Sequence, residues 1–281
     1  MSPKLATATF DILRDLIAER CGIVYPDSKR ASLESKLSEH VLELGLPDFL
    51  VYLKQLEESA ADSALWQELF QRVSTNETYF HRNAPQIKVF SEVLVPESMQ
   101  AQKGKMFRRL KIWSAACATG EEPYTLAMEL LSVLGDQVNE WQPTIYATDI
   151  DRQAIESAKA GRYQDRAVAQ VPPDYMQCYF RQEEDGYQVT DPVREMVTFK
   201  VLNFANDEEM STQINMDIVF CRNVLIYFDT AFRKRVVSHL FNSLRPGGFL
   251  VIGHSESLRN LHEGFDVRRF PGTLVYQRPE A

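Results

Sequence analysis

From about residue 106 onward, short apolar runs alternate with helical stretches, and this alternation limits the possible folds more than any other feature. The run LKIWSA precedes the helical stretch PYTLAMELLSVL, and TIYATD precedes a helix that starts near Arg152. The runs VTFKVL, MDIVFC and FLVIG continue the pattern, with the helix FRKRVVSHLFNSL and a turn at Pro246-Gly247-Gly248 before the last. Such a pattern is typical of a mostly parallel sheet covered by helices. We expect the closing run TLVYQR to pair as an antiparallel edge strand.

Residues 1–75 lack this alternation and carry apolar stripes at helical spacing instead. The stripes are Phe10, Leu13 and Ile17 and then Leu33, Leu37, Val41 and Leu44. The second stripe follows Asp27-Ser28, which can cap free backbone N–H groups, and ends at Gly45, which can adopt a left-handed conformation. Pro47-Asp48 then opens another helix. These signals predict several short helices and no strand.

The change of texture predicts an all-α domain at residues 1–78 and an α/β domain at residues 79–281. Within the second domain, residues 161–200 fit the alternation poorly, because the runs GYQVT and MVTFKV are short and separated by turn-forming residues. We therefore expect a small antiparallel β subdomain within about 161–200.

Charge and composition exclude several classes of protein. The net charge of −8 opposes an extended nucleic-acid surface, which requires clustered Lys and Arg. No apolar run approaches the roughly 20 residues that cross a bilayer, and the N-terminus does not resemble a signal peptide. Four scattered cysteines form no C-x-x-C pair. We expect a cytoplasmic protein without bound nucleic acid, direct membrane insertion or a structural metal.

The loop after the first predicted strand is made of small residues and ends in two acids, Glu121 and Glu122, before Pro123. In open parallel sheets, ligands bind at the carboxyl ends of the strands. A loop for pyrophosphate would carry several glycines, whereas this loop has only Gly120. Its acids suit a cationic ligand, such as the ammonium group of S-adenosylmethionine. Either acid alone is explained nearly as well by the helix dipole.

The ends of the next strands carry further candidates. Asp149 follows TIYAT, 29 residues beyond Gly120, where nucleoside-binding folds place an acid that accepts from both ribose hydroxyls. Asp151 is the competing acid and more naturally caps the next helix. Asn203 and Phe204 follow VTFKVL and could flank an adenine ring.

Two more polar runs stand out. One is CRNVLIYFD, which directly follows the apolar run MDIVF, and the other is STNETYFHR at the expected domain junction. Junctions between domains are common places for pockets.

Together these segments resemble the CheR family of chemoreceptor glutamate methyltransferases. The motifs that carry the resemblance are NETYFHR, WSAACATGEEPYTLA, ATDID, CRNVLIYFD and RPGGFLVIGHSE, in the family's order and over nearly the whole chain. The resemblance implies a Rossmann-like methyltransferase domain that binds S-adenosylmethionine, carries a small β subdomain and follows a helical domain. It also implies O-methylation of specific glutamate side chains of bacterial chemoreceptors.

By motif position, the resemblance assigns contacts to the cofactor. These residues are Asn76, Thr78 and Arg82 at the junction, Glu122 at the methionine end, Asp149 at the ribose, and Asn203, Phe204, Arg222 and Asn223 around the adenosyl group. Family members commonly have Asn-Leu where this chain has Asn203-Phe204, so this contact runs through the backbone or is reshaped by the ring.

Arg82 and Tyr227 are the residues we expect beside the reacting methyl group. A glutamate carboxylate, with a pKa of about 4.3, is already ionised and needs no general base. The enzyme must align carboxylate oxygen, methyl carbon and sulfur at roughly 3 Å and exclude water. We hypothesise that Arg82 and the Tyr227 hydroxyl orient the carboxylate. Alternatively, Arg82 forms a junction salt bridge and Tyr227 is an aromatic residue that starts a helix.

The sequence allows alternative interpretations of one residue and of the function. His254 in GHSES could join the pocket's polar network in a structural role, and the other histidines show no metal-ligand spacing. A nicotinamide-dependent oxidoreductase would share the strand and helix pattern but lacks its glycine fingerprint. A module that binds S-adenosylmethionine as a sensor, without catalysis, would retain the same motifs.

The expected partner is the cytoplasmic helical region of chemoreceptors. Some relatives tether to a receptor pentapeptide through the β subdomain, but the turn RQEEDG is shorter and less glycine-rich than their loop. We therefore predict pentapeptide independence. Residues 1–75 carry 8 basic and 12 acidic residues, so only a local basic face around Lys29, Arg30 and Lys36 could attract an acidic receptor surface.

Overall fold

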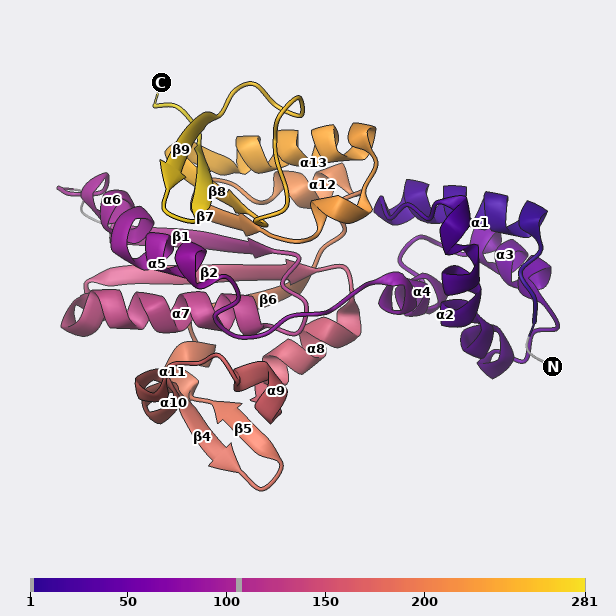
Figure 1. Cartoon of the computed structure of the whole chain (residues 1–281), viewed down its shortest axis with the longest axis horizontal. Helices are drawn as coiled ribbons and strands as arrows, with labels where there is room; N and C mark the ends of the chain where they lie inside the picture. The colour runs from indigo at the N-terminus through magenta and orange to yellow at the C-terminus, as the bar shows by residue number, and fades with distance from the viewer. Residues whose placement is uncertain (1–2, 105–107, 281) are drawn as a thin grey trace.

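The N-terminal helices form a lobe of their own beside a larger α/β lobe (Figure 1). The computed structural model describes residues 3–104 and 108–280. The helices of the first lobe are α1 (Thr7–Cys21), α2 (Arg30–Glu43), α3 (Phe49–Glu58) and α4 (Ala64–Val73). Across the described ranges, no helix combines the length and apolar character needed to cross a membrane.

The apolar stripes predicted from the sequence form the core of the first lobe, with one exception. The stripe residues of α1 and the first three of α2 are buried, but Leu44 is 39% exposed because α2 ends at Glu43. Asp48 caps α3, as predicted, by accepting from the backbone N–H groups of Leu50 and Val51. Asp27 and Ser28, in contrast, form a 3₁₀ turn and give no side-chain cap to α2. The predicted helical domain is confirmed.

A seven-stranded sheet forms the centre of the second lobe, in the order β6-β2-β1-β7-β8-β10-β9. Its strands are β1 (Arg108–Ala115), β2 (Trp141–Asp149), β6 (Val197–Val201), β7 (Met216–Cys221), β8 (Leu244–Ile252), β9 (Asp266–Phe270) and β10 (Thr273–Gln277). The neighbouring strands β6, β2, β1, β7 and β8 are parallel to one another, which confirms the predicted α/β fold.

Two details of the sheet differ from the prediction. The closing run is antiparallel, but β10 lies between β8 and β9, so the edge strand is β9, which the sequence did not predict. The residues Pro246-Gly247-Gly248 lie within β8 rather than before it, and the pairing of β7 with β8 shifts register there. An irregular strand accommodates this proline and these glycines because the backbone pairing is locally interrupted.

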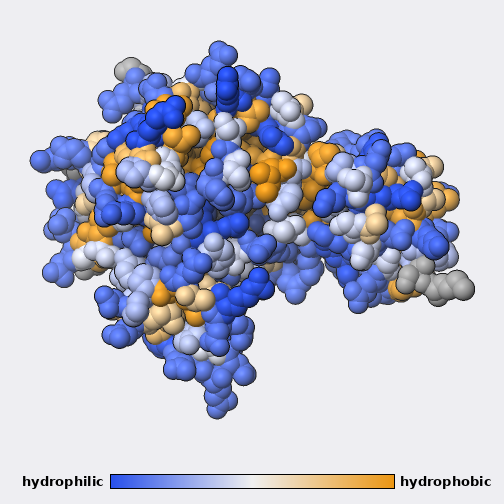
Figure 2. Space-filling model, viewed as in Figure 1, coloured by the Kyte–Doolittle hydropathy of each residue, from blue (hydrophilic) through white to orange (hydrophobic). Residues whose placement is uncertain are grey.

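Helices cover both faces of the sheet and thereby create two apolar cores. Successive side chains of a strand point to opposite faces, so Ile218 packs in one core and Val219 in the other. The helices of this lobe are α5 (Ala84–Val89), α6 (Val95–Gln100), α7 (Glu121–Leu134), α8 (Arg152–Ala160), α12 (Asp207–Ser211) and α13 (Thr230–Ser243). Polar side chains cover most of the face seen in Figure 2, with smaller apolar areas between them.

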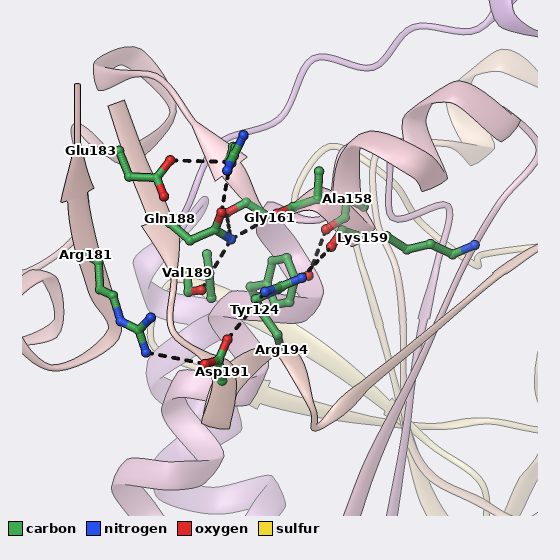
Figure 3. A network of polar contacts seen from close by, with 12 residues as sticks. Tyr124, Ala158, Lys159, Gly161, Arg181, Glu183, Gln188, Val189, Asp191 and Arg194 are labelled. Carbon is green, nitrogen blue, oxygen red and sulfur yellow. Dashed lines mark hydrogen bonds and ion pairs between the residues drawn. The ribbon is translucent and has the colours of Figure 1, made fainter. Parts of the chain in front are cut away.

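A small antiparallel sheet of order β3-β5-β4 projects from this lobe, as predicted. It consists of β3 (Arg162–Tyr163), β4 (Phe180–Glu183) and β5 (Gly186–Val189), with the short helices α9 (Asp165–Val168), α10 (Pro173–Tyr179) and α11 (Asp191–Arg194). The run VTFKV, however, forms β6 of the main sheet. The side-chain amide of Gln188 donates to the carbonyls of Ala160 and Gly161, and Arg194 donates to that of Lys159, which fixes the subdomain to the end of α8 (Figure 3).

The two lobes are joined by backbone contacts as well as by the chain. Ile23 forms an antiparallel bridge with Phe228, and the N–H of Val24 donates to the carbonyl of Tyr227 at 2.9 Å. Next to this bridge, a Cβ built on Gly22 would lie 2.0 Å from the Phe232 ring, so only glycine permits this approach. The segment after α1 therefore follows the first lobe in the chain and packs against the second lobe.

Candidate active site

One cavity lies where the N-terminal helices meet the carboxyl ends of the central strands. It encloses about 880 Å³, part of it open to solvent. All ten residues predicted for the site line it, namely Asn76, Thr78, Arg82, Glu122, Asp149, Asn203, Phe204, Arg222, Asn223 and Tyr227. Residues that are up to 151 positions apart in the sequence are thus brought to one place, and their individual roles stay predictions.

Asp149 ends β2 as a buried acid whose only hydrogen bonds among the described residues come from the backbone. Its Oδ2 accepts from the N–H of Ala118 at 2.8 Å, and its Oδ1 accepts from the N–H of Asp151 at 3.0 Å. Burial raises the pKa of Asp149 to about 6, and the backbone donors only partly offset this effect. Each oxygen keeps a lone pair for a hydroxyl donor.

Asp151, the competing acid, has a different task. Its Oδ1 accepts from the N–H groups of Gln153 and Ala154 and caps α8, while its Oδ2 accepts from the side chain of Asn76 at 2.6 Å. This confirms the predicted helix cap. It also shows that Asn76 fastens the segment between the lobes to the start of α8.

Glu122 and Arg222 form a buried ion pair in the same cavity. Arg222 Nε lies 3.1 Å from Glu122 Oε2, and the other oxygen of Glu122 accepts from Ser114 Oγ at 2.7 Å. Burial raises the pKa of Glu122 despite the arginine, and burial also lowers the pKa of Arg222. Burial therefore disfavours the charged form of both residues, and the attraction between them partly offsets this cost.

The guanidinium of Arg222 has N–H groups that donate no hydrogen bond to the described residues. Its side chain is only 3% exposed, and its Nη2 donates to the carbonyl of Arg82 at 2.8 Å. Its Nη1, in contrast, has no hydrogen-bond partner among the residues that the structure describes. A buried guanidinium with a free donor in a cavity fits a ligand carboxylate, because an unpaired buried donor is costly. S-adenosylmethionine carries such a carboxylate.

Arg82 lies on the segment between the lobes and is partly exposed. Its Nη1 donates to the carbonyl of Glu77 at 2.9 Å, and its guanidinium lies 5.7 Å from the centre of the Tyr79 ring. It forms no ion pair among the described residues, so the junction salt bridge considered as an alternative is absent there.

Tyr227 is also on a short connection, the 3₁₀ turn Leu225–Tyr227 after β7. Its carbonyl accepts from Val24, so the first lobe holds the backbone of this turn while the side chain lines the cavity.

Asn203 uses its side chain to connect the lobes rather than leaving it free. Its Nδ2 donates to the carbonyl of Arg20 at the end of α1 at 2.7 Å, and its Oδ1 accepts from the N–H of Ala205 at 2.9 Å. Phe204 is 7% exposed and packs edge-on to Phe228. The side chain of Asn203 is therefore oriented by these two bonds, and each of its polar atoms can form one more.

Two other candidates are placed differently from the expectation. Glu121 is buried next to Glu122 in sequence but lines a separate cavity near Tyr163, so only one of the two acids reaches the main cavity. His254 is exposed and lines a third cavity, so it is not part of the polar network around the site. The acid of the same motif, Glu256, hydrogen-bonds to the backbone of Asn223 instead.

The sequence predicted site residues at the junction, but it did not predict that the end of α1 supplies part of the cavity wall. Cys21 and Ile23, at the end of α1, line the cavity together with Ser74 and Thr75. The one available signal was the run STNETYFHR at the junction, which pointed to the second pair but not to the first.

Comparison with known proteins agrees with this architecture. The sequence model of the "CheR methyltransferase, SAM binding domain" matches residues 76–272, and that of the "CheR methyltransferase, all-alpha domain" matches residues 8–74. Chemotaxis protein methyltransferase 2 of Vibrio cholerae is 33% identical over 267 residues, which cover 95% of this chain and 91% of that protein.

Two further relatives are similar to a comparable degree. The chemotaxis protein methyltransferase of Escherichia coli is 33% identical over 276 residues, which cover 97% of this chain and 91% of that protein. Chemotaxis protein methyltransferase 1 of Vibrio cholerae is 34% identical over 269 residues, which cover 93% of each. The chain therefore belongs to the CheR family and is a methyltransferase that uses S-adenosylmethionine.

Proposed function

We propose that this enzyme transfers a methyl group from S-adenosylmethionine to glutamate side chains in the cytoplasmic helical region of bacterial chemoreceptors, and that it works in the cytoplasm. The observation that carries the proposal is that motif residues from both lobes meet in one cavity, with Glu122, Asp149 and the free donor of Arg222 on its wall. The relatives that share the chain's length are named chemotaxis protein methyltransferases, which supports the choice of substrate.

The polar groups of the cavity match the parts of the cofactor. The two oxygens of Asp149, each of which accepts one backbone N–H, would also accept from the ribose hydroxyls. Glu122 would hold the methionine ammonium, and Arg222 would hold the methionine carboxylate through Nη1. Phe204 would offer an apolar surface to the adenine, and Asn76, Thr78 and Asn223 would complete the wall.

The reaction requires positioning more than proton transfer. Bound S-adenosylmethionine supplies an electrophilic methyl group on its sulfonium. Arg82 and the Tyr227 hydroxyl orient the substrate carboxylate, which is already ionised near neutral pH. Their grip must stay moderate, because the carboxylate loses its charge in the transition state and a tight ion pair would stabilise the ground state more. The partial exposure of Arg82 is consistent with such a contact.

A methyl-transfer assay with a receptor cytoplasmic fragment and labelled S-adenosylmethionine tests the proposal. We expect labelled glutamate methyl esters with the wild-type protein. Arg82→Ala and Tyr227→Phe should each lower kcat by about 10- to 100-fold at saturating cofactor. Arg259→Ala removes an exposed arginine outside the cavity and serves as the control. Cofactor binding without any transfer would favour the sensor over the enzyme.

We also propose that receptor recognition does not use a pentapeptide and that the protein binds no nucleic acid. The strands β4 and β5 are joined by a two-residue turn, since Glu183 pairs with Gly186, and this leaves little loop for a peptide. The net charge of −8 supports the second point. Titration calorimetry with a receptor C-terminal pentapeptide should show no micromolar binding.

The basic face expected on the first lobe is smaller than the sequence indicated. Lys36 is partly buried and donates to the carbonyls of Val73 and Ser74 at the end of α4. Of the three residues of the expected face, Lys29 and Arg30 are exposed and available to an acidic receptor surface. A receptor contact at this face would therefore be local and weak.

A further inference from the structure

The turn that follows β8 lies against the loop that carries Arg222 and Asn223. Glu256 extends its carboxylate from this turn into the loop. Its Oε2 accepts from the N–H of Asn223 at 2.9 Å and from the N–H of Gly253 at 2.7 Å. A backbone bond from the N–H of Glu256 to the carbonyl of Gly253 closes the turn at 2.9 Å. One carboxylate oxygen thus holds two segments that are about 30 residues apart in the sequence.

The loop at Asn223 has a left-handed backbone. Asn223 has a φ of 61°, in the region that asparagine adopts more readily than most other residues with a Cβ. Its neighbour Arg222 must at the same time keep its contacts with Glu122 and with the carbonyl of Arg82. Glu256 supplies a charged acceptor at this point.

Gly253 provides independent evidence that this contact is built into the fold. A Cβ at this position would lie 2.7 Å from Glu256 Oε2 and 2.9 Å from the backbone nitrogen of Asn223. A side chain here would therefore push the carboxylate away from both of its donors. The motif GHSE combines the glycine that leaves the space with the acid that fills it.

We propose that Glu256 is a positioning residue for the cofactor: its carboxylate fixes the backbone of Asn223 and so presents Arg222 and Asn223 to bound S-adenosylmethionine. This inference rests on the proposed placement of the cofactor in the main cavity. The negative charge of Glu256, like that of Glu122, also favours the charged form of Arg222 and raises its pKa against the effect of burial. We assign no positioning role to the exposed neighbour His254.

The test compares substitutions of Glu256 with that of His254 in the full-length protein. Glu256→Ala removes a charged acceptor of two backbone N–H groups, and we expect a Kd for S-adenosylmethionine that is about 10- to 100-fold weaker. Glu256→Gln keeps a side-chain oxygen that can accept both bonds, so it should recover most of the affinity. His254→Ala should bind like the wild type.

A split of the kinetic constants separates positioning from a loss of folded protein. We expect Glu256→Ala to raise the KM for S-adenosylmethionine while kcat at saturating cofactor stays within about threefold of the wild type. Gly253→Ala should also weaken binding, because its Cβ would crowd both Glu256 Oε2 and the backbone nitrogen of Asn223. Since both substitutions act on the same loop, their effects should add incompletely in the double variant.

The outcomes distinguish this inference from the proposed function. If the wild-type protein does not bind S-adenosylmethionine, the proposed function fails whatever the variants do. If the wild type binds but Glu256→Ala and Gly253→Ala both retain its Kd within about twofold, only the role of Glu256 is refuted. Full additivity in the double variant would also contradict a shared contact.

Discussion

Asp149 and Glu122 are two acids on the wall of one cavity, yet their surroundings differ. Glu122 has its counter-charge within the protein, because Arg222 Nε lies 3.1 Å from its Oε2. Among the residues that the structure describes, Asp149 accepts from backbone N–H groups, including those of Ala118 and Asp151, and forms no ion pair, and burial raises its pKa to about 6. Removing Glu122 should therefore damage the protein itself, whereas removing Asp149 should chiefly damage the binding of the ligand.

The largest expected effect is on stability, at the paired acid. Glu122→Ala leaves the guanidinium of Arg222 buried without its partner, which should lower the free energy of unfolding by about 3–5 kcal/mol. The double variant Glu122→Ala/Arg222→Met removes both charges and should recover most of this loss. Urea unfolding of the ligand-free proteins measures both values. A single variant as stable as the wild type would contradict the importance of the pair.

The next effect is on affinity, at the unpaired acid. Asp149→Ala removes the acceptor of both ribose hydroxyls, and two bonds to a charged acceptor contribute roughly 3–6 kcal/mol. The Kd for S-adenosylmethionine should therefore weaken by about 100-fold or more. The control is Asp151→Asn, which keeps an oxygen to cap α8 and should change the Kd by less than about fivefold. Calorimetry that showed equal losses would remove the distinction between these acids.

The affinity for the ligand and the stability of the fold should both depend on pH through Asp149, and they should change in opposite directions. Ligand binding needs the ionised form of Asp149, so affinity should fall by about fourfold between pH 7.5 and 5.5, given a pKa of about 6. The folded protein also binds this proton more tightly than the unfolded chain, whose value is near 3.8. The contribution of Asp149 to stability is therefore present at low pH and is lost as the pH rises through about 6.

Comparison with Asp149→Ala isolates the group from other titrating residues. Binding measured in the wild type at both pH values should show the affinity change. The difference in unfolding free energy between the wild type and Asp149→Ala should shift against the wild type as the pH rises. A difference that moves in the other direction would show that the pKa of Asp149 is not raised.

The smallest effect is expected at Glu121, the neighbour of Glu122. It accepts from Thr119 Oγ1 at 2.7 Å and lines a cavity that does not include Glu122. Glu121→Gln should therefore change the Kd for S-adenosylmethionine by less than about twofold, since the substitution keeps an oxygen for the Thr119 hydroxyl. A larger loss would mean that both acids act on the ligand.

Local patterns in the sequence predicted much of the architecture. The central parallel strands follow from their apolar runs, and the polar residues after them meet because parallel strands end at one edge of the sheet. The edge strand β9 was missed because three of the five residues Asp266–Phe270 are charged and none is buried, so it has no buried apolar run. The division of the chain at residue 78 stays a prediction.

These local patterns did not predict contacts between segments that are distant in the sequence. Nothing in the spacing of residues in α1 indicates that Cys21 and Ile23 line the cavity, because this depends on how the lobes dock. Likewise, the motif GHSE contains three polar side chains, and the sequence alone favoured His254. The structure shows that the turn directs His254 outward and Glu256 inward.

The bridge between Ile23 and Phe228 limits how this protein could be re-engineered. A chimera that exchanged the first 75 residues for those of a relative would also replace Cys21, Ile23 and Ser74 on the wall of the cavity. Grafting would succeed only if the incoming segment met Tyr227 and Phe228 with the same backbone geometry. An exchange of the N-terminal lobe would therefore alter the ligand cavity together with the surface of that lobe.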